Sequence, residues 1–221
     1  MTKTVGLIGG FSWQTMAIYY QEINEYVNSK LGGIHSANLL IRSIDYSDLA
    51  SMVSAKDLGG MTAMLCACGQ QLKAANAQAL STGLPVLHIC DFTARQIVDK
   101  GHRRVGLLAT RAVMEEDFYK DRLRGFGLEV YVPDEDFRSD ADRMIFCEMS
   151  KEQISQGVKT TWHTAYQDLV QDHNVDCIIL GCTELRLVFG QEDLTAPTFE
   201  TTTIHARGIA DWALAESTVF T

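Results

Sequence analysis

A cysteine stands directly after a strongly apolar segment, in the stretch Cys177–Glu184. The residues before Gly181 are typical of a buried parallel strand, and parallel sheets bind ligands at the carboxyl ends of their strands. Helix N-terminal amides at such a place lower the pKa of a thiol and favour the reactive thiolate. The triplet Cys182-Thr183-Glu184 therefore allows two interpretations of equal weight. Cys182 is either a reactive thiol beside a hydroxyl that binds a carboxylate, or a small buried core residue.

A second candidate is the turn Gly9–Gln14, which follows the first apolar run. Paired glycines let a backbone approach a ligand closely, and Ser12 can cap the next helix while the amides there face an anion. The turn has no G-x-G-x-x-G fingerprint and no P-loop lysine, so it gives little support to nucleotide binding. A purely structural turn fits these residues as well.

Further polar residues lie at the ends of predicted elements. His88 and His205 can each contact a substrate, although a structural hydrogen bond is the more common role of such a histidine. Thr110 and Arg111 follow a predicted strand. Arg111 offers paired donors to a carboxylate, and a surface salt bridge is the competing interpretation.

The composition fits a globular chain and excludes several function classes. The chain has 221 residues, of which 46% are hydrophobic and 21% are charged, so disorder is not expected. A net charge of −9 without basic clusters argues against nucleic-acid binding. No apolar run reaches the roughly 18 residues that a membrane span needs.

The cysteines indicate a reducing compartment. Their six positions are Cys66, Cys68, Cys90, Cys147, Cys177 and Cys182, and the N-terminus shows no secretory signal pattern. We therefore expect free thiols and a cytoplasmic location. Cys66 and Cys68 stand two apart on a predicted helix, where they point to different faces and make a poor metal pair. The sequence indicates neither a metal nor an organic cofactor.

Short apolar runs alternate with helical stretches, which predicts an α/β fold with parallel sheets flanked by helices. The candidate strands are Thr4–Gly9, Asn38–Ile44, Leu84–Ile89, Val105–Ala109, Leu128–Val132, Cys177–Gly181 and Pro197–Glu200. The candidate helices are Trp13–Lys30, Lys56–Ala77, Phe92–Lys100, Glu115–Phe126, Ala141–Glu148, Lys159–Asp172 and Thr203–Ala215.

An internal repeat divides the chain into two pseudo-symmetric halves. The segment Lys3–Gly9 resembles Arg103–Ala109 one hundred residues later, and a similar order of elements follows each. We predict a first domain of residues 1–98 with the C-terminal helix 203–221, a second domain of residues 99–202, and a small-molecule site in the cleft between them. The repeat is imperfect, because the first half lacks a counterpart to the strand and turn Cys177–Glu184.

Six segments, in order and over nearly the whole chain, resemble the aspartate/glutamate racemase family, and most closely its PLP-independent bacterial amino-acid racemases. They are Val5–Trp13, Leu31–Ala37, Leu108–Arg111, Met114–Tyr119, Gly181–Glu184 and Thr202–Ala206. The resemblance implies a homodimeric enzyme in which two cysteines flank the α-carbon of an amino acid. One thiolate removes the α-proton, and the other thiol returns a proton to the opposite face.

The resemblance also implies roles for individual residues. Cys182 matches the catalytic cysteine of the second domain, and the substrate-binding residues are Ser12, Thr110, Thr183, Glu184 and His205. The first catalytic cysteine has no match: the family pattern Cys-Thr-Asn-Thr or Cys-Asn-Thr is absent between Leu80 and Leu84. Letting Cys66 or Cys68 replace it would sacrifice the match of the preceding helix.

This gap leaves three hypotheses open. In the first, the chain is an amino-acid racemase for aspartate, glutamate or a wider range of amino acids. Its two-base chemistry is then either intact or altered by an internal deletion. Alternatively, it is a catalytically impaired homologue that binds amino acids or dicarboxylates. The third hypothesis is a decarboxylase or isomerase in which a single thiol protonates a planar intermediate on one face.

Overall fold

The computed structural model describes residues 2–10, 12–78, 86–151, 154–190 and 194–215, and these form two compact units. The first unit comprises Met1–Leu87 with Ala206–Thr221, and the second comprises His88–His205. These units divide the chain at residues 87/88 and 205/206, whereas the sequence predicted domains of 1–98 with 203–221 and of 99–202. The difference concerns α4 (Ile89–Asp99), which packs against α6 (Asp117–Arg124) in the second unit.

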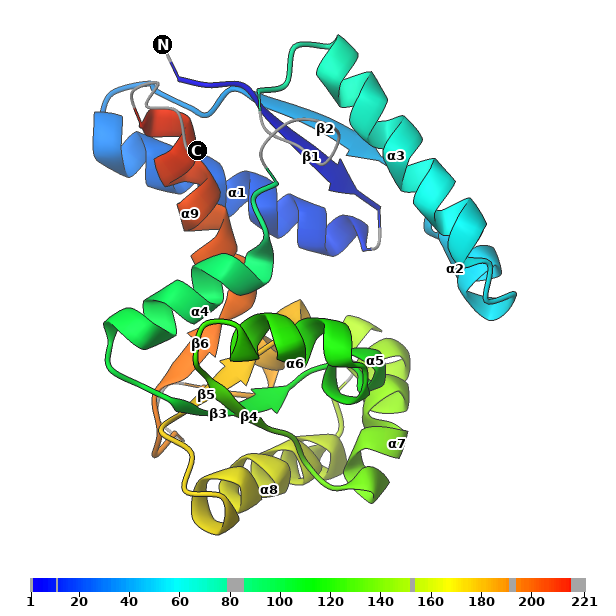
Figure 1. Ribbon diagram of the computed structural model, residues 1–221, viewed down its shortest axis with the longest axis vertical. Coiled ribbons are helices and arrows are strands. Elements are labelled where there is room, and N and C mark those ends of the chain that lie inside the picture. Colours follow the sequence, from blue (N-terminus) through cyan, green and yellow to red (C-terminus); the bar gives the residue numbers. More distant parts are fainter. Residues whose placement is uncertain (1, 11, 79–85, 152–153, 191–193, 216–221) are drawn as a thin grey trace. The chain divides into compact units, whose positions relative to one another are not determined.

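The second unit contains a parallel sheet whose described strands follow the order β4-β3-β5-β6 (Figure 1). They are β3 (Arg104–Leu108), β4 (Glu129–Tyr131), β5 (Cys177–Leu180) and β6 (Thr198–Glu200). All of β5 and four of the five residues of β3 are buried. This burial on both faces explains why their sequences are continuous apolar runs rather than alternating ones.

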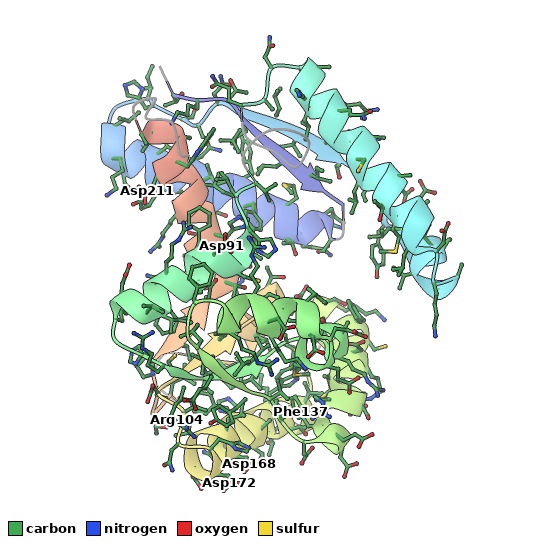
Figure 2. All side chains as sticks on the ribbon, viewed as in Figure 1. Asp91, Arg104, Phe137, Asp168, Asp172 and Asp211 are labelled. Atoms are coloured by element: carbon green, nitrogen blue, oxygen red, sulfur yellow. The ribbon has the colours of Figure 1, made fainter. Side chains whose placement is uncertain are left out.

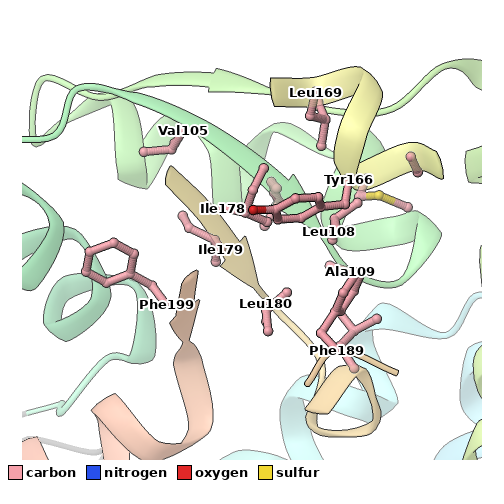
Figure 3. Close-up of a cluster of buried hydrophobic side chains, with 14 of the residues drawn as sticks. Val105, Leu108, Ala109, Tyr166, Leu169, Ile178, Ile179, Leu180, Phe189 and Phe199 are labelled. Atoms are coloured by element: carbon pink, nitrogen blue, oxygen red, sulfur yellow. The ribbon is translucent and has the colours of Figure 1, made fainter. Parts of the chain in front are cut away.

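Helices flank this sheet and complete its core. Besides α4 and α6 they are α5 (Arg111–Glu115), α7 (Glu135–Arg143), the π-helix η1 (Met144–Glu148), the short 3-10 helices η2 (Met149–Lys151) and η3 (Thr183–Leu187), and α8 (Gln156–Asp172). From α8, Tyr166 lies beside the strand residues Ile178 and Leu108 (Figure 3). Its hydroxyl donates to the carbonyl of Ala196 and accepts from the amide of the same residue, so this buried polar group is satisfied.

The sheet of the first unit is smaller. Its described strands are β1 (Val5–Gly9) and β2 (Leu39–Ser43), which pair in parallel with Val5 opposite Leu39. The unit also contains α1 (Trp13–Leu31), α2 (Tyr46–Ser54), α3 (Leu58–Ala74) and the part of α9 (Thr201–Leu214) from Ala206 onward. Apolar residues of α1 and α9 pack against Val5 and Leu7 in one core cluster.

The edge of β1 that faces away from β2 has little pairing among the described residues. The amide of Gln78 donates to the carbonyl of Thr4 at 2.8 Å, and the chain then enters residues 79–85, which lie outside the described part. In the second unit the equivalent edge of β3 pairs with β5 along four residues. The described residues of the two units therefore differ at the place where the sequence predicted a missing strand.

The predicted strand Leu84–Ile89 was wrong in its described part. Residues 86–88 are not in a strand, and Ile89 begins α4. The reason is local, because the ring nitrogen Nδ1 of His88 accepts the backbone amide of Cys90 at 3.1 Å and caps the helix there. This contact also shows His88 making a structural hydrogen bond.

The glycine turn after β1 has a structural explanation. Gly10 has φ +108°, and a Cβ at this position would overlap the backbone of Ile44. The amide of Ile44 in turn donates to the carbonyl of Gly9 at 2.9 Å. The close approach that Gly10 permits is therefore to the chain's own backbone at the end of β2.

The predicted α/β fold with parallel sheets flanked by helices is confirmed. Within the described ranges, no helix is both long enough and apolar enough to cross a membrane.

Candidate functional site

The carboxyl edge of the second sheet holds the Cys-Thr-Glu triplet. After β5 ends, the amide of Gly181 donates to the carbonyl of Leu108 at 2.8 Å, which keeps the turn against β3. A Cβ on Gly181 would lie 2.9 Å from the Cβ of Ala109, so only glycine allows this close packing without a shift. Cys182 then continues in extended conformation, with φ −138° and ψ 141°, immediately before η3.

One carboxylate oxygen joins the three side chains of the triplet. Glu184 Oε2 accepts a hydrogen bond from the Cys182 thiol at 2.8 Å and another from the Thr183 hydroxyl at 2.8 Å. All three residues are half-buried. The Cys182 thiol therefore donates its hydrogen bond to a carboxylate, which is a group that can act as a proton acceptor.

The surroundings of Cys182 raise the pKa of its thiol well above the ordinary value. Burial is the largest cause, followed by the negative charge of Glu184 and the hydrogen bond to it. The amides of Thr183 and Glu184 act in the opposite direction but are outweighed. The sequence predicted a lowered pKa from such amides, and that prediction was wrong because burial and the carboxylate dominate. At neutral pH Cys182 is a thiol, so it can donate a proton directly and accept one only after passing its own to Glu184.

This pair gives a prediction that needs no substrate. Glu184→Gln removes a negative charge and a hydrogen bond that favour the protonated thiol, so the pKa of Cys182 should fall. Alkylation of Cys182 by iodoacetamide, followed by mass spectrometry of its peptide across pH, should reach its midpoint at lower pH than in the wild type. The exposed Glu135→Gln is the matched control and should leave the midpoint in place. An unchanged or higher midpoint in Glu184→Gln would contradict the role of the carboxylate.

Thr110 lies at the same edge of the sheet, two residues after β3, which is the neighbour of β5. Leu108 and Leu180 are register partners, so Thr110 and Cys182 occupy equivalent places on adjacent strands. Thr110 precedes α5 and makes no side-chain capping bond to it. Arg111 instead pairs with Glu115 at 2.9 Å on the surface, which is the salt bridge that competed with carboxylate binding in the sequence interpretation.

His205 belongs to the helix that leaves this edge. Thr201, the first residue of α9, donates its hydroxyl to the carbonyl of Leu180 at 3.1 Å and so ties the start of the helix to β5. One turn later, the half-buried ring of His205 lies against Phe92 of α4, with 5.6 Å between ring centroids. The structure thus places His205 one helical turn beyond the sheet edge, next to an aromatic ring.

Ser12 lies in the first unit and has a clear local role. Its hydroxyl oxygen accepts the backbone amide of Thr15 at 3.3 Å, which caps α1, and its hydroxyl donates to Gln14 at 2.9 Å. The cap confirms the structural half of the sequence interpretation. A part for Ser12 in substrate binding, and a cleft between the two domains, stay predictions.

Glu200 is a site candidate that was not predicted from the sequence. This carboxylate ends β6 in register with Leu180, and its Oε1 atom is buried with no hydrogen-bond partner among the described residues. Its Oε2 accepts the hydroxyl of Thr203 at 3.2 Å. The sequence contained a signal for this residue, because Glu200 is an ionisable residue at the end of a predicted strand.

Cys66 and Cys68 do not supply a second site. Both lie on α3, where Cys66 is exposed and Cys68 is buried, so the prediction that they face different ways is confirmed. Across the described ranges, no group of three or more His, Cys, Asp or Glu side chains is arranged to hold a metal ion.

A cavity of about 500 Å³ lies elsewhere in the second unit. It is lined by residues from around α7 and α8, among them Phe137, Asp168 and Asp172 (Figure 2). None of the predicted site residues lines it. Its aspartates would repel a substrate carboxylate, so the cavity is a poor place for an acidic amino acid.

Comparison with known proteins identifies relatives over almost the full chain. The model of the Asp/Glu/Hydantoin racemase family matches residues 8–209. The crystal structure of a candidate Asp/Glu racemase from Yersinia pestis is 36% identical with a TM-score of 0.91, and the alignment covers 96% of this chain and 100% of that one.

Two further relatives are more distant or shorter. The structure of an aspartate racemase homologue from Pyrococcus horikoshii is 26% identical, with a TM-score of 0.82 and coverage of 96% and 99%. A protein from Pectobacterium carotovorum, known only as the product of the pnlA 3' region, is 33% identical over 114 residues, which is 51% of this chain and 73% of that protein.

Proposed function

The chain belongs to the Asp/Glu/Hydantoin racemase family, and from this membership we propose that it is a PLP-independent, cysteine-based amino-acid racemase. Its substrate is aspartate, glutamate or a wider set of amino acids. Cys182 removes the α-proton of one enantiomer and donates a proton to the same face when the other enantiomer reacts, while a second acid or base serves the opposite face. The observation that carries the proposal is the hydrogen bond between the Cys182 thiol and the Glu184 carboxylate at the carboxyl edge of a parallel sheet. The family fold supports an isomerase of the racemase kind.

The contacts of Cys182 suggest how the proton moves. When Cys182 acts as a base, its thiol proton passes to Glu184, and the resulting thiolate removes the α-proton of the amino acid. The electron pair of the broken C–H bond stays on the substrate as a carbanion conjugated with its carboxylate. In the reverse direction, with Glu184 protonated from solvent, the Cys182 thiol gives its proton to that carbanion. The proton on Glu184 then restores the Cys182 thiolate to a thiol, and Glu184 is left as a carboxylate.

The carbanion needs donors at the substrate carboxylate, where charge accumulates. Thr110 and Thr183 stand at the carboxyl edge beside Cys182, and their hydroxyl and amide groups are of the type that stabilises such charge. We assign substrate binding to these threonines together with Glu184, His205 and Ser12.

One observation favours a second candidate. Two-sided inversion needs a second acid or base across the α-carbon, and the described residues of the first unit place no cysteine at the end of a strand. A site with Cys182 alone would exchange the α-proton with retention, act once on a planar intermediate as in a decarboxylase or isomerase, or bind amino acids without turnover.

Chiral chromatography decides between these functions. The purified chain is incubated with L- and D-aspartate, L- and D-glutamate and a panel of other amino acids, and each enantiomer is quantified over time. Interconversion of enantiomers supports the racemase. Calorimetric binding without interconversion supports the impaired homologue, and the absence of turnover across the whole panel contradicts racemase activity. The homodimer implied by the family likeness and the cytoplasmic location expected from the cysteines stay predictions.

A further inference from the structure

The carboxylate of Glu200 has one oxygen without a hydrogen-bond donor in the described part of the chain. Oε2 accepts the hydroxyl of Thr203, whereas Oε1 is buried and unpaired. A buried acceptor left without a donor costs free energy, and nearly all such atoms in native proteins have a partner. The unpaired oxygen therefore needs either a ligand or another explanation.

Glu200 lies close in the fold to Cys182. It is the register partner of Leu180, which precedes Cys182 by two residues. Register partners in a parallel sheet point to the same face, and so do residues two apart on an extended strand. Glu200, Leu180 and Cys182 therefore lie on one face of the sheet. The bond from the Thr201 hydroxyl to the Leu180 carbonyl holds the end of β6 beside β5.

The acceptors at this edge are not equally available. In Glu184, Oε2 already receives both the Cys182 thiol and the Thr183 hydroxyl. In Glu200, the buried Oε1 receives no hydrogen bond from the described residues, and the carboxylate of Glu184 at the same edge adds a second negative charge that favours a cation. An ammonium group supplies three donors and a positive charge, and a charge-assisted bond to a carboxylate is about twice as strong as a neutral one.

We propose that Glu200 binds the α-ammonium group of the amino acid through Oε1 and so selects amino acids over the corresponding acids that lack the amino group. This assignment rests on the proposed function, because it takes an amino acid as the ligand of the Cys182 site. It also separates two tasks, since Oε2 remains with Thr203 at the start of α9 and the unpaired Oε1 is left to accept from the ammonium group.

The test pairs one substitution with two ligands. Glu200→Gln keeps an oxygen for Thr203 but loses the negative charge. Calorimetry measures its affinity for whichever of aspartate, glutamate or alanine binds the wild type most tightly, and for the matching acid without the amino group: succinate, glutarate or propionate. The amino acid should bind the variant at least about tenfold more weakly than the wild type, with the deaminated acid changing less than about threefold. Glu135→Gln, an exposed charge on α7, is the matched control and should change neither affinity.

The outcomes separate this inference from the proposed function. Equal losses for both ligands in Glu200→Gln would overturn the inference while leaving a racemase intact. The wild type supplies a second measurement that does not depend on the variant folding: it should prefer the amino acid over the deaminated acid at least about tenfold, and equal affinities would also overturn the inference. A wild type that binds no amino acid would remove the proposed function together with the inference.

Discussion

Replacing Cys182 by alanine should lower the rate of α-proton transfer by about 10²–10⁴-fold, which is the range that general acid–base groups contribute. Cys182 is the motif thiol that the family likeness retains, and Glu184 accepts a hydrogen bond from it at 2.8 Å. Alanine removes the sulfur that carries the proton and keeps only the Cβ atom of the side chain. The rate is measured as the loss of the α-proton signal of the substrate by NMR.

Two control variants make this result specific. Cys66→Ala removes an exposed thiol on α3 and should leave the rate unchanged, which also tests the prediction that Cys66 does not act as the first catalytic cysteine. Cys182→Ser keeps a hydroxyl that is a much weaker acid than a thiol, so it should lose nearly as much activity as alanine. Retention of wild-type activity in Cys182→Ser would contradict a thiol mechanism.

The strands of the two units should differ strongly in amide hydrogen exchange. In the second unit β3 is paired on both sides, by β4 and β5, and both β3 and β5 are almost wholly buried. In the first unit β2 has three exposed residues out of five, and β1 pairs along its length with β2 alone among the described strands. Local unfolding therefore requires less free energy in β1, and its amides should exchange about a hundredfold faster than those of β5.

Exchange followed by mass spectrometry on peptides from each strand measures this difference. Peptides covering β1 should take up deuterium before those covering β5, and the peptide covering β6 serves as an internal reference for a short edge strand. Equal protection of β1 and β5 would contradict this difference in local stability between the two units.

Most strands could be predicted from the sequence because their apolar runs are short and have clear ends. The predicted Cys177–Gly181 became β5 at Cys177–Leu180, and the predicted Thr4–Gly9 became β1 at Val5–Gly9. Helix ends were harder. The prediction missed α2 and began the next helix at Lys56, where a positive φ of 54° separates α2 from α3 and Asp57 caps the new helix. These local features depend on backbone angles that composition does not reveal.

The candidate site was predictable in its residues but not in its electrostatics. The spacing of Cys182, Thr183 and Glu184 after an apolar run located the triplet, and the structure joins all three at one carboxylate oxygen. The direction of the Cys182 pKa shift depends on burial and on which way the Glu184 side chain points, and neither is visible in a sequence. Glu200 was missed because its importance comes from the register of β6 against β5.

Deuterium incorporation at the α-carbon tests whether Cys182 transfers the α-proton of an amino acid. The wild-type chain is incubated in D2O with a single enantiomer of aspartate, glutamate or another amino acid from the panel, and both enantiomers are then analysed for deuterium. We predict that the wild type replaces the α-proton by deuterium and that Cys182→Ala does not, with deuterium in the opposite enantiomer when inversion is complete. No incorporation into any amino acid, or incorporation that persists in Cys182→Ala, would contradict the account.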